Sequence, residues 1–176
     1  MKQIVKPAVI LLAVCTVVAL LLAGTQVLTK DRIAAIEEAQ KAAAILSVLP
    51  TAQSADPLAR EGMDAYVGRD SEGRTVGFAF VRSAKGYGGD VTVTAGFDLN
   101  GRLTGISVSA PDETPGLGVN VQKDSFLSQF NGIFAGENLG SVDYVTSATY
   151  SSKAVESALQ EILSDCRTVM REEGLV

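Results

Sequence analysis

The chain has 176 residues, of which 47% are hydrophobic, and its formal net charge is −5. It contains no histidine and only two cysteines, Cys15 and Cys166, with no CxxC pair. This composition argues against zinc, iron–sulfur and histidine-ligated haem sites, excludes catalytic triads that need histidine, and offers no disulfide framework. Any redox chemistry would therefore need an organic cofactor.

The hydrophobic residues are concentrated at the N-terminus, where residues 7–29 carry no charge. As a helix this segment would span about 34 Å, against roughly 30 Å of bilayer hydrocarbon. We expect an uncleaved signal anchor that crosses the membrane once. A cleaved signal peptide is the alternative, since Leu22-Ala23-Gly24 offers small residues to a peptidase. The apolar run is, however, longer than a usual signal-peptide core, and a helical pattern continues beyond it.

The basic residues around this segment do not decide its orientation, because Lys2 and Lys6 precede it while Lys30, Arg32 and Lys41 follow it. From Lys30 onward the chain has 13 basic and 20 acidic residues, a net charge of −7. No basic stripe with interleaved aromatic residues is present, which argues against nucleic acid as a partner.

The next segment, Asp31–Val48, has apolar residues at helical spacing with charged residues between them. It is expected to prolong the membrane helix as a stalk and to end before Pro50. Residues 51–62 contain Pro57 and several small polar residues, and are interpreted as a loop or linker. The chain is thus divided into three parts: a membrane anchor (1–29), a stalk helix and linker (30–62), and one folded domain (63–176).

The folded domain begins with a β-rich section. Residues 65–69 and 75–83 are expected to form strands. Over residues 91–97, apolar side chains alternate with Thr and Gly, a period of two that marks a half-buried strand. Asn100-Gly101 is a strong hairpin signal, and residues 103–110 form the return strand. Together these segments predict an antiparallel sheet.

Two helices are expected after the sheet. Residues 123–131 form a short one, with Phe126 and Phe130 as apolar anchors. The last helix is expected from Ser151 to about Glu172, because its apolar residues make one stripe while its charged residues face away. The predicted fold class is α+β, an antiparallel sheet packed with helices and preceded by one N-terminal transmembrane helix.

Two glycine-rich loops could carry chemistry, KGYGG at residues 85–89 and ETPGLG at residues 113–118. Glycines let a backbone approach a flat ligand closely and aim its N–H groups at it. Glu113 and Thr114 could supply hydrogen bonds to a polar ring edge. Taken alone, KGYGG is better explained as a glycine-rich connection between two strands, and ETPGLG is only weak evidence for a function.

A third segment, DYVTSATYSSKAV at Asp143–Val155, places Thr149 among small residues just before Ser151 and Ser152. A helix N-terminus here would have free N–H groups and a partial positive charge, which suits a phosphate. The alternative is that Ser151 or Ser152 only caps the last helix. The two interpretations are compatible.

Together the three segments resemble a known family. KGYGG, ETPGLG and D-x-x-T-S-A-T followed by SSKAV, in this order behind one membrane span, resemble the FMN-binding domain of the G-type subunit of the Rnf electron-transport complex. The pattern is also similar to the C-type subunit of the Na+-translocating NADH:quinone oxidoreductase. The resemblance covers Ala65 to the C-terminus and implies that the domain at residues 63–176 binds FMN.

This resemblance implies that Thr149 carries FMN covalently, through a phosphoester to its hydroxyl. A flavin transferase would install the group, and Asp143 would belong to the sequence that this enzyme recognises. No side chain is expected to act as a general acid or base, and no metal ligand is expected. The other cofactor-binding residues that it implies are Glu113, Thr114, Leu117, Gly118, Ser147, Ala148, Ser151, Ser152 and Tyr87.

The chain departs from the family pattern at two points. Family members often have SGAT where this chain has Thr146-Ser147-Ala148-Thr149, so Ser147 stands at the glycine position. The serine is expected to be tolerated if its φ is negative. Many relatives also carry a histidine shortly before ETPGLG, where this chain has Ala110-Pro111-Asp112, so any role of that histidine is absent or moved.

The resemblance implies an electron carrier in the cell inner (plasma) membrane, with its soluble domain on the extracytoplasmic, periplasmic side. Its partners would be the other membrane and redox subunits of an ion-translocating complex that couples ferredoxin oxidation to NAD+ reduction. Two alternatives stay open. One is the C-type subunit of the quinone oxidoreductase, whose members usually carry more sequence between anchor and flavin motif. The other is a membrane-anchored binding module without a redox cofactor.

Overall fold

The computed structural model describes residues 2–175, without the side chains of residues 2–6 and Ala8. The predicted anchor's first residue, Met1, and the side chains of Lys2 and Lys6 therefore lie outside the described part. The chain divides into two compact units, Met1–Lys41 and Ala42–Val176.

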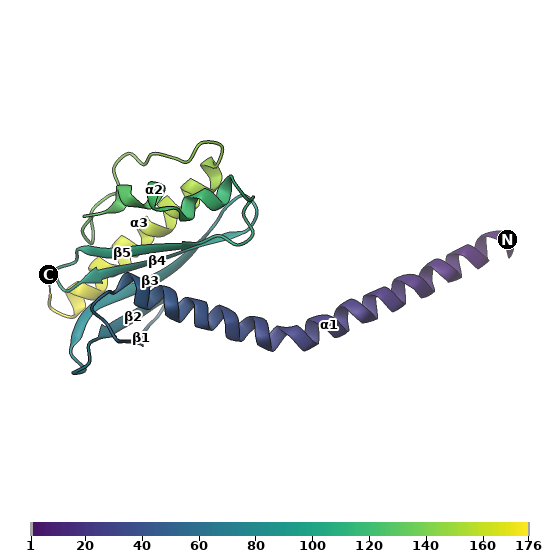
Figure 1. The fold of residues 1–176 in the computed structure, drawn as a ribbon, viewed down its shortest axis with the longest axis horizontal. Helices are drawn as coiled ribbons and strands as arrows, with labels where there is room; N and C mark the ends of the chain where they lie inside the picture. The colour runs from purple at the N-terminus through teal and green to yellow at the C-terminus, as the bar shows by residue number, and fades with distance from the viewer. Residues whose placement is uncertain (1, 176) are drawn as a thin grey trace. The chain divides into compact units, whose positions relative to one another are not determined.

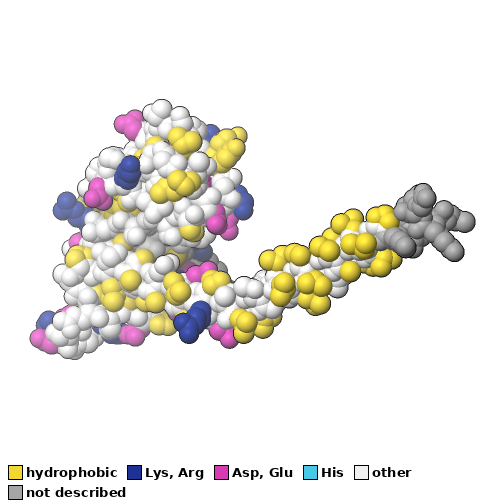
Figure 2. Space-filling model, turned by 45° about the vertical axis from the view of Figure 1, so that its right-hand side comes forward, with side chains coloured by type: hydrophobic (Ala, Val, Ile, Leu, Met, Phe, Trp, Pro, Cys, Tyr) yellow, Lys and Arg dark blue, Asp and Glu magenta, His cyan; other side chains and the backbone are white. Residues whose placement is uncertain are grey.

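The first unit consists of most of helix α1, which runs from Lys2 to Val48 (Figure 1). It holds an apolar window of mean hydropathy 2.4, long and apolar enough to cross a membrane. The large apolar side chains from Val9 to Leu28 are exposed, and Figure 2 shows hydrophobic side chains gathered along this helix. Such exposure suits a segment that faces lipid. The prediction that the helix continues beyond the apolar segment and ends before Pro50 is confirmed, while its role as a stalk stays a prediction.

The second unit is built on a five-stranded antiparallel sheet in which every strand pairs with its sequence neighbours (Figure 1). Its strands are β1 (Ser54–Arg60), β2 (Met63–Arg69), β3 (Thr75–Lys85), β4 (Asp90–Asp98) and β5 (Leu103–Ser109). The Asn100-Gly101 hairpin is present, and Gly101 there has a φ of 77° that glycine adopts without strain. The antiparallel sheet and the four predicted strands are confirmed.

The prediction of a loop over residues 51–62 is wrong for Ser54–Arg60, which forms strand β1 and pairs with β2 along its whole length. Pro57 is compatible with this strand because β1 lies at the edge of the sheet, where one side needs no backbone donor. Most of β1 is exposed. It therefore lacks the apolar alternation by which a strand is recognised in a sequence.

Helix α3 (Thr149–Glu172) packs against β3 and β4 on one face of the sheet. The short helices η1 (Gly118–Gln122), α2 (Asp124–Leu127) and η2 (Ser128–Phe130) add apolar side chains to the same core. Phe80 and Phe97 from the sheet meet edge to face in it, with ring centroids 6.1 Å apart. The observed arrangement confirms the α+β fold class.

The opposite face of the sheet is also covered, so residues 91–97 are not the half-buried strand that the alternation predicts. All of these residues are buried except Thr92, which is partly exposed. The cover comes from the last turn of α1 and from Leu49, which follows it. The buried cluster that they form with β3 comprises Ile45, Val48, Leu49, Ala79 and Val81.

Glycines in the strands make room for this close approach. A Cβ atom at Gly96 would lie 2.2 Å from the carbonyl oxygen of Val48, and one at Gly68 would lie 2.7 Å from Leu49 Cδ1. The Thr104 hydroxyl donates to the same Val48 carbonyl oxygen at 2.6 Å. Glycine inside a strand often marks such a contact, so the signal was present in the sequence.

Candidate functional site

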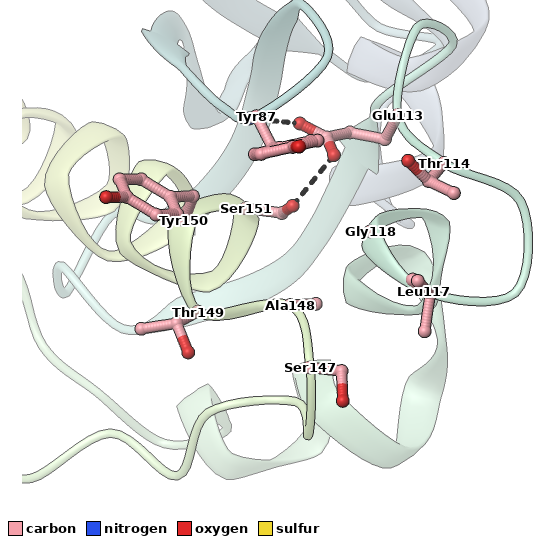
Figure 3. A pocket seen from close by; sticks show the side chains of 10 residues that line it. All are labelled: Tyr87, Glu113, Thr114, Leu117, Gly118, Ser147, Ala148, Thr149, Tyr150 and Ser151. Carbon is pink, nitrogen blue, oxygen red and sulfur yellow. Dashed lines mark hydrogen bonds between the residues drawn. The ribbon is translucent and has the colours of Figure 1, made fainter.

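A pocket of about 490 Å³ lies where the start of α3 meets the two glycine-rich loops (Figure 3). Its volume falls within the roughly 300–1,000 Å³ typical of small-molecule sites. Three segments that are far apart in the sequence therefore meet at one place. The residues that line it are Tyr87, Glu113, Thr114, Leu117, Gly118, Ser147, Ala148, Thr149, Tyr150 and Ser151.

Nine of the ten residues predicted to bind the cofactor line this pocket. The tenth, Ser152, is fully buried beside it, and its hydroxyl oxygen accepts the Val145 N–H at 3.1 Å. Asp143, the predicted recognition residue, is exposed and does not line the pocket. The structure thus brings the predicted residues together, while their contacts to a ligand stay predictions.

Thr149 is the first residue of α3, and its exposed side chain lines the pocket. The N-cap residue is Ala148, and within residues 2–175 no side chain donates or accepts a capping hydrogen bond at this helix start. The first-turn N–H groups therefore lack a side-chain acceptor. Because the helix dipole adds a partial positive charge, such a terminus attracts an anion such as a phosphate.

The prediction that Ser151 or Ser152 caps this helix is wrong. Both serines lie inside the first turn, as the third and fourth residues of α3, whereas a cap must precede the helix. Their hydroxyls are used elsewhere. Ser151 donates to Glu113 at 2.9 Å, and Ser152 accepts the N–H of Val145.

Ser147 has a φ of +64°, in the left-handed region that residues other than glycine rarely adopt. The condition of a negative φ, under which serine was expected to be tolerated here, is therefore not met. The conformation costs an L-residue about 1–2 kcal/mol. The strain lies in the turn that leads directly into Thr149, two residues on.

Glu113 is only 3% exposed, and its carboxylate joins three parts of the site. One oxygen, Oε1, accepts the backbone N–H groups of Tyr87 at 2.7 Å and Gly88 at 3.2 Å. The other, Oε2, accepts the hydroxyl of Ser151 (Figure 3). The carboxylate therefore holds the protein's own loops together, and its predicted hydrogen bond to a ring edge stays a prediction.

The glycines of both loops leave space for this carboxylate. A Cβ atom at Gly86 would lie 2.2 Å from Glu113 Oε1, and one at Gly118 would lie 2.2 Å from Oε2. A side chain at either position would displace Glu113. At least part of the glycine content of the two motifs thus serves the carboxylate, in addition to any approach of a ligand.

Two exposed tyrosines stand at the pocket. Tyr87 is 75% exposed and Tyr150 is 69% exposed, with ring centroids 6.3 Å apart and ring planes at 46°. Large exposed aromatic rings offer a flat surface for a planar ligand. Sequence reasoning missed Tyr150, although an aromatic residue directly after Thr149 in a run of small residues is a visible signal.

Two family models match the chain. The FMN-binding domain matches residues 86–164, which include the pocket and most of α3. The RnfG N-terminal region matches residues 1–48, which correspond to α1. The fold and the site thus define a protein with an FMN-binding domain behind one candidate transmembrane helix.

The G-type subunit of the ion-translocating oxidoreductase complex of Methanosarcina acetivorans is 31% identical to this chain, over 90% of this chain and 92% of the relative. The G-type subunit of the Na(+)-translocating ferredoxin:NAD(+) oxidoreductase complex of Acetobacterium woodii is 30% identical, over 90% and 89%. Among solved structures, the C-type subunit of Na(+)-translocating NADH-quinone reductase from Parabacteroides distasonis is 22% identical, over 58% and 59%, with a TM-score of 0.48. The chain belongs to the RnfG family of subunits of ion-translocating oxidoreductase complexes, as its motifs predict.

Proposed function

We propose that this chain is the FMN-carrying electron-transfer subunit of an ion-translocating membrane complex that couples ferredoxin oxidation to NAD+ reduction. The observation that carries the proposal is an exposed threonine, Thr149, at the uncapped start of α3 within a pocket of ligand size. The FMN-binding domain match and the RnfG-family relatives support FMN as the cofactor and the complex as its setting.

The proposed attachment is a phosphoester between the Thr149 hydroxyl and FMN. The linked phosphate keeps a negative charge, which the free N–H groups and the dipole at the start of α3 would stabilise. The pocket beside it would hold the ring system, against the backbone around Leu117 and Gly118, with Tyr87 and Tyr150 at its edge. FMN supplies the redox chemistry when bound, and the chain positions it and sets its electrostatic surroundings.

Installation by a flavin transferase requires that the enzyme can reach the motif. Asp143 is exposed, and the side chain of Gln129 forms hydrogen bonds with both its backbone N–H and its backbone carbonyl oxygen. Its N–H donates to Gln129 Oε1 at 2.9 Å, and Gln129 Nε2 donates to its carbonyl oxygen at 3.3 Å. This arrangement leaves the carboxylate free to face solvent, which supports a role for Asp143 in recognition by the transferase.

The proposed orientation places residues 1–29 in the plasma membrane and the FMN-binding domain on the extracytoplasmic side. A covalent bond suits that side, because a lost cofactor could not easily be replaced there. We further propose that the part of α1 after residue 29 serves as a stalk before the FMN-binding domain, whose sheet includes β1. The pairing of β1 with β2 attaches the end of the predicted linker to that sheet.

The test is production of the full chain together with a flavin transferase. The wild-type chain should give a fluorescent band after denaturing electrophoresis, and Thr149→Ala should give none. Thr168→Ala, at the far end of the same helix, is the matched control and should keep the band. Mass spectrometry of the peptide around Thr149 should show the added mass of FMN less one water. A known substrate of the same transferase serves as the positive control. If that substrate fluoresces and the wild-type band does not, a membrane-anchored binding module without a redox cofactor would be favoured instead.

A further inference from the structure

The buried carboxylate of Glu113 stands out because, among the described residues that line the pocket with it, there is no Lys or Arg. The donors to Glu113 are instead the neutral N–H groups of Tyr87 and Gly88 and the hydroxyl of Ser151. Burying a carboxylate in this way is costly, and neutral donors satisfy its hydrogen bonds without cancelling its charge.

The three donors come from two separate elements. Tyr87 and Gly88 belong to the loop between β3 and β4, whereas Ser151 lies in the first turn of α3. The same first turn begins with Thr149. Through Glu113, the glycine-rich loop and the start of α3 are therefore held at a fixed distance from each other. The positive end of the α3 dipole also favours a carboxylate at this place.

We propose that Glu113 is a positioning residue for the flavin site, and that its buried negative charge lowers the reduction potential of the bound flavin. The inference rests on the function proposed above. It differs from a direct hydrogen bond to the ring, because the residue acts through the loop and helix that it joins and through its charge.

The sign of the effect follows from charge alone. Reduction adds negative charge to the flavin. Where no proton is taken up to neutralise that charge, a nearby carboxylate makes reduction less favourable. A pocket of about 490 Å³ is only roughly 10 Å across. At that distance and an effective dielectric constant of about 20, the carboxylate changes the equilibrium constant for adding a unit charge by about tenfold. Removing the charge should therefore make reduction easier by about that factor.

Glu113→Gln separates charge from hydrogen bonding. The glutamine amide oxygen can accept the two backbone N–H groups, and its NH2 group can donate to the Ser151 oxygen. Asp112→Asn is the matched control, since it removes the same charge from an exposed neighbour. Glu113→Ala removes both the charge and the hydrogen bonds.

The first measurement is a redox titration of the flavin absorbance in the full chain, produced with the transferase and purified in detergent. Glu113→Gln should raise the ratio of reduced to oxidised flavin at fixed potential by about tenfold, equivalent to about 59 mV for a one-electron step or 30 mV for a two-electron step. Asp112→Asn should change it less than twofold. If Glu113→Gln and Asp112→Asn shift the potential equally, the proposed charge effect is overturned.

The second measurement needs no flavin. Amide hydrogen exchange over residues 86–88, in the full chain made without transferase, should be at least tenfold faster in Glu113→Ala than in wild type. Glu113→Gln should stay near the wild-type rate. Unchanged exchange in Glu113→Ala would refute the positioning role. If the wild-type chain takes up no flavin, the proposed function and the effect on potential both fail, while the exchange rates still decide whether Glu113 fixes the loop.

Discussion

Ser147 offers a quantitative test of the geometry at the start of α3. Its φ of +64° should cost about 1–2 kcal/mol relative to an unstrained residue. Glycine adopts this conformation freely but loses more backbone entropy on folding, about 0.5–1 kcal/mol. Ser147→Gly should therefore stabilise the domain by about 0–1.5 kcal/mol, which is the difference between the two effects.

A matched variant isolates the backbone term. Ser141 is another exposed serine in the irregular segment before α3, and it is not among the described residues with positive φ. Ser141→Gly gains nothing from relief of strain, so it should destabilise by about 0.5–1 kcal/mol through entropy alone. The two glycine variants should thus differ by about 1–2 kcal/mol. Ser147→Val should be the least stable of the set, because a β-branched residue is a genuine outlier at positive φ.

Thermal unfolding of the full chain in detergent, followed by the near-ultraviolet circular dichroism of its tyrosines, measures these differences. For a domain of this size, 1 kcal/mol corresponds to about 3–5 °C in Tm. The Ser147→Gly variant should melt about 3–10 °C above Ser141→Gly. Equal or reversed melting temperatures would mean that Ser147 is not held in the left-handed region, and the strain ascribed to this turn would have to be abandoned.

Three further outcomes are expected. Gly96→Ala should destabilise the sheet domain by about 1–3 kcal/mol, because its Cβ would meet the α1 backbone; urea titration should show this loss and almost none for Gly140→Ala, which has open space. Burial raises the pKa of the Cys166 thiol from the ordinary 9.0 to about 12. Between these two pH values the thiol keeps its proton in the native state and loses it in the unfolded state. The free energy of unfolding should then fall as pH rises from about 9 to 12, and Cys166→Ala should remove that part of the slope. Under the proposed role of Asp143 in transferase recognition, Gln129→Ala should slow flavin attachment when the transferase is limiting, because it releases the backbone of Asp143. The Tm should stay nearly unchanged, and an unaltered rate in a time course of in-gel fluorescence would contradict this.

The sheet and α3 could be predicted because their signals are local. Alternation over residues 91–97 and the Asn100-Gly101 hairpin identify strands directly, and the apolar stripe of α3 identifies a helix. The elements that escaped prediction depend on tertiary contacts. Strand β1 is exposed at an edge and owes its form to pairing with β2. The cover over the second face comes from the end of α1, and only the glycines of the strands hint at it.

The candidate site divides in the same way. Which residues meet in the pocket could be predicted from three motifs, because the family resemblance groups them as one set. How they meet could not. Glu113 was expected to face a ligand, yet its oxygens are taken up by Tyr87, Gly88 and Ser151. Hydrogen-bond partners of a buried carboxylate depend on the distance between loops, and no local pattern encodes that distance.

This arrangement bears on how substitutions in the glycine-rich loop should act. Gly86 and Gly118 come from different motifs, but each leaves room for one oxygen of the same carboxylate. A side chain at either position would move Glu113, and Glu113 would move the first turn of α3 through Ser151. Because Thr149 begins that turn, a change in the loop at residues 85–89 can shift the proposed attachment point without contacting it. The two glycine motifs and the first turn of α3 are therefore connected through one shared carboxylate, in addition to any contact that each makes with a cofactor.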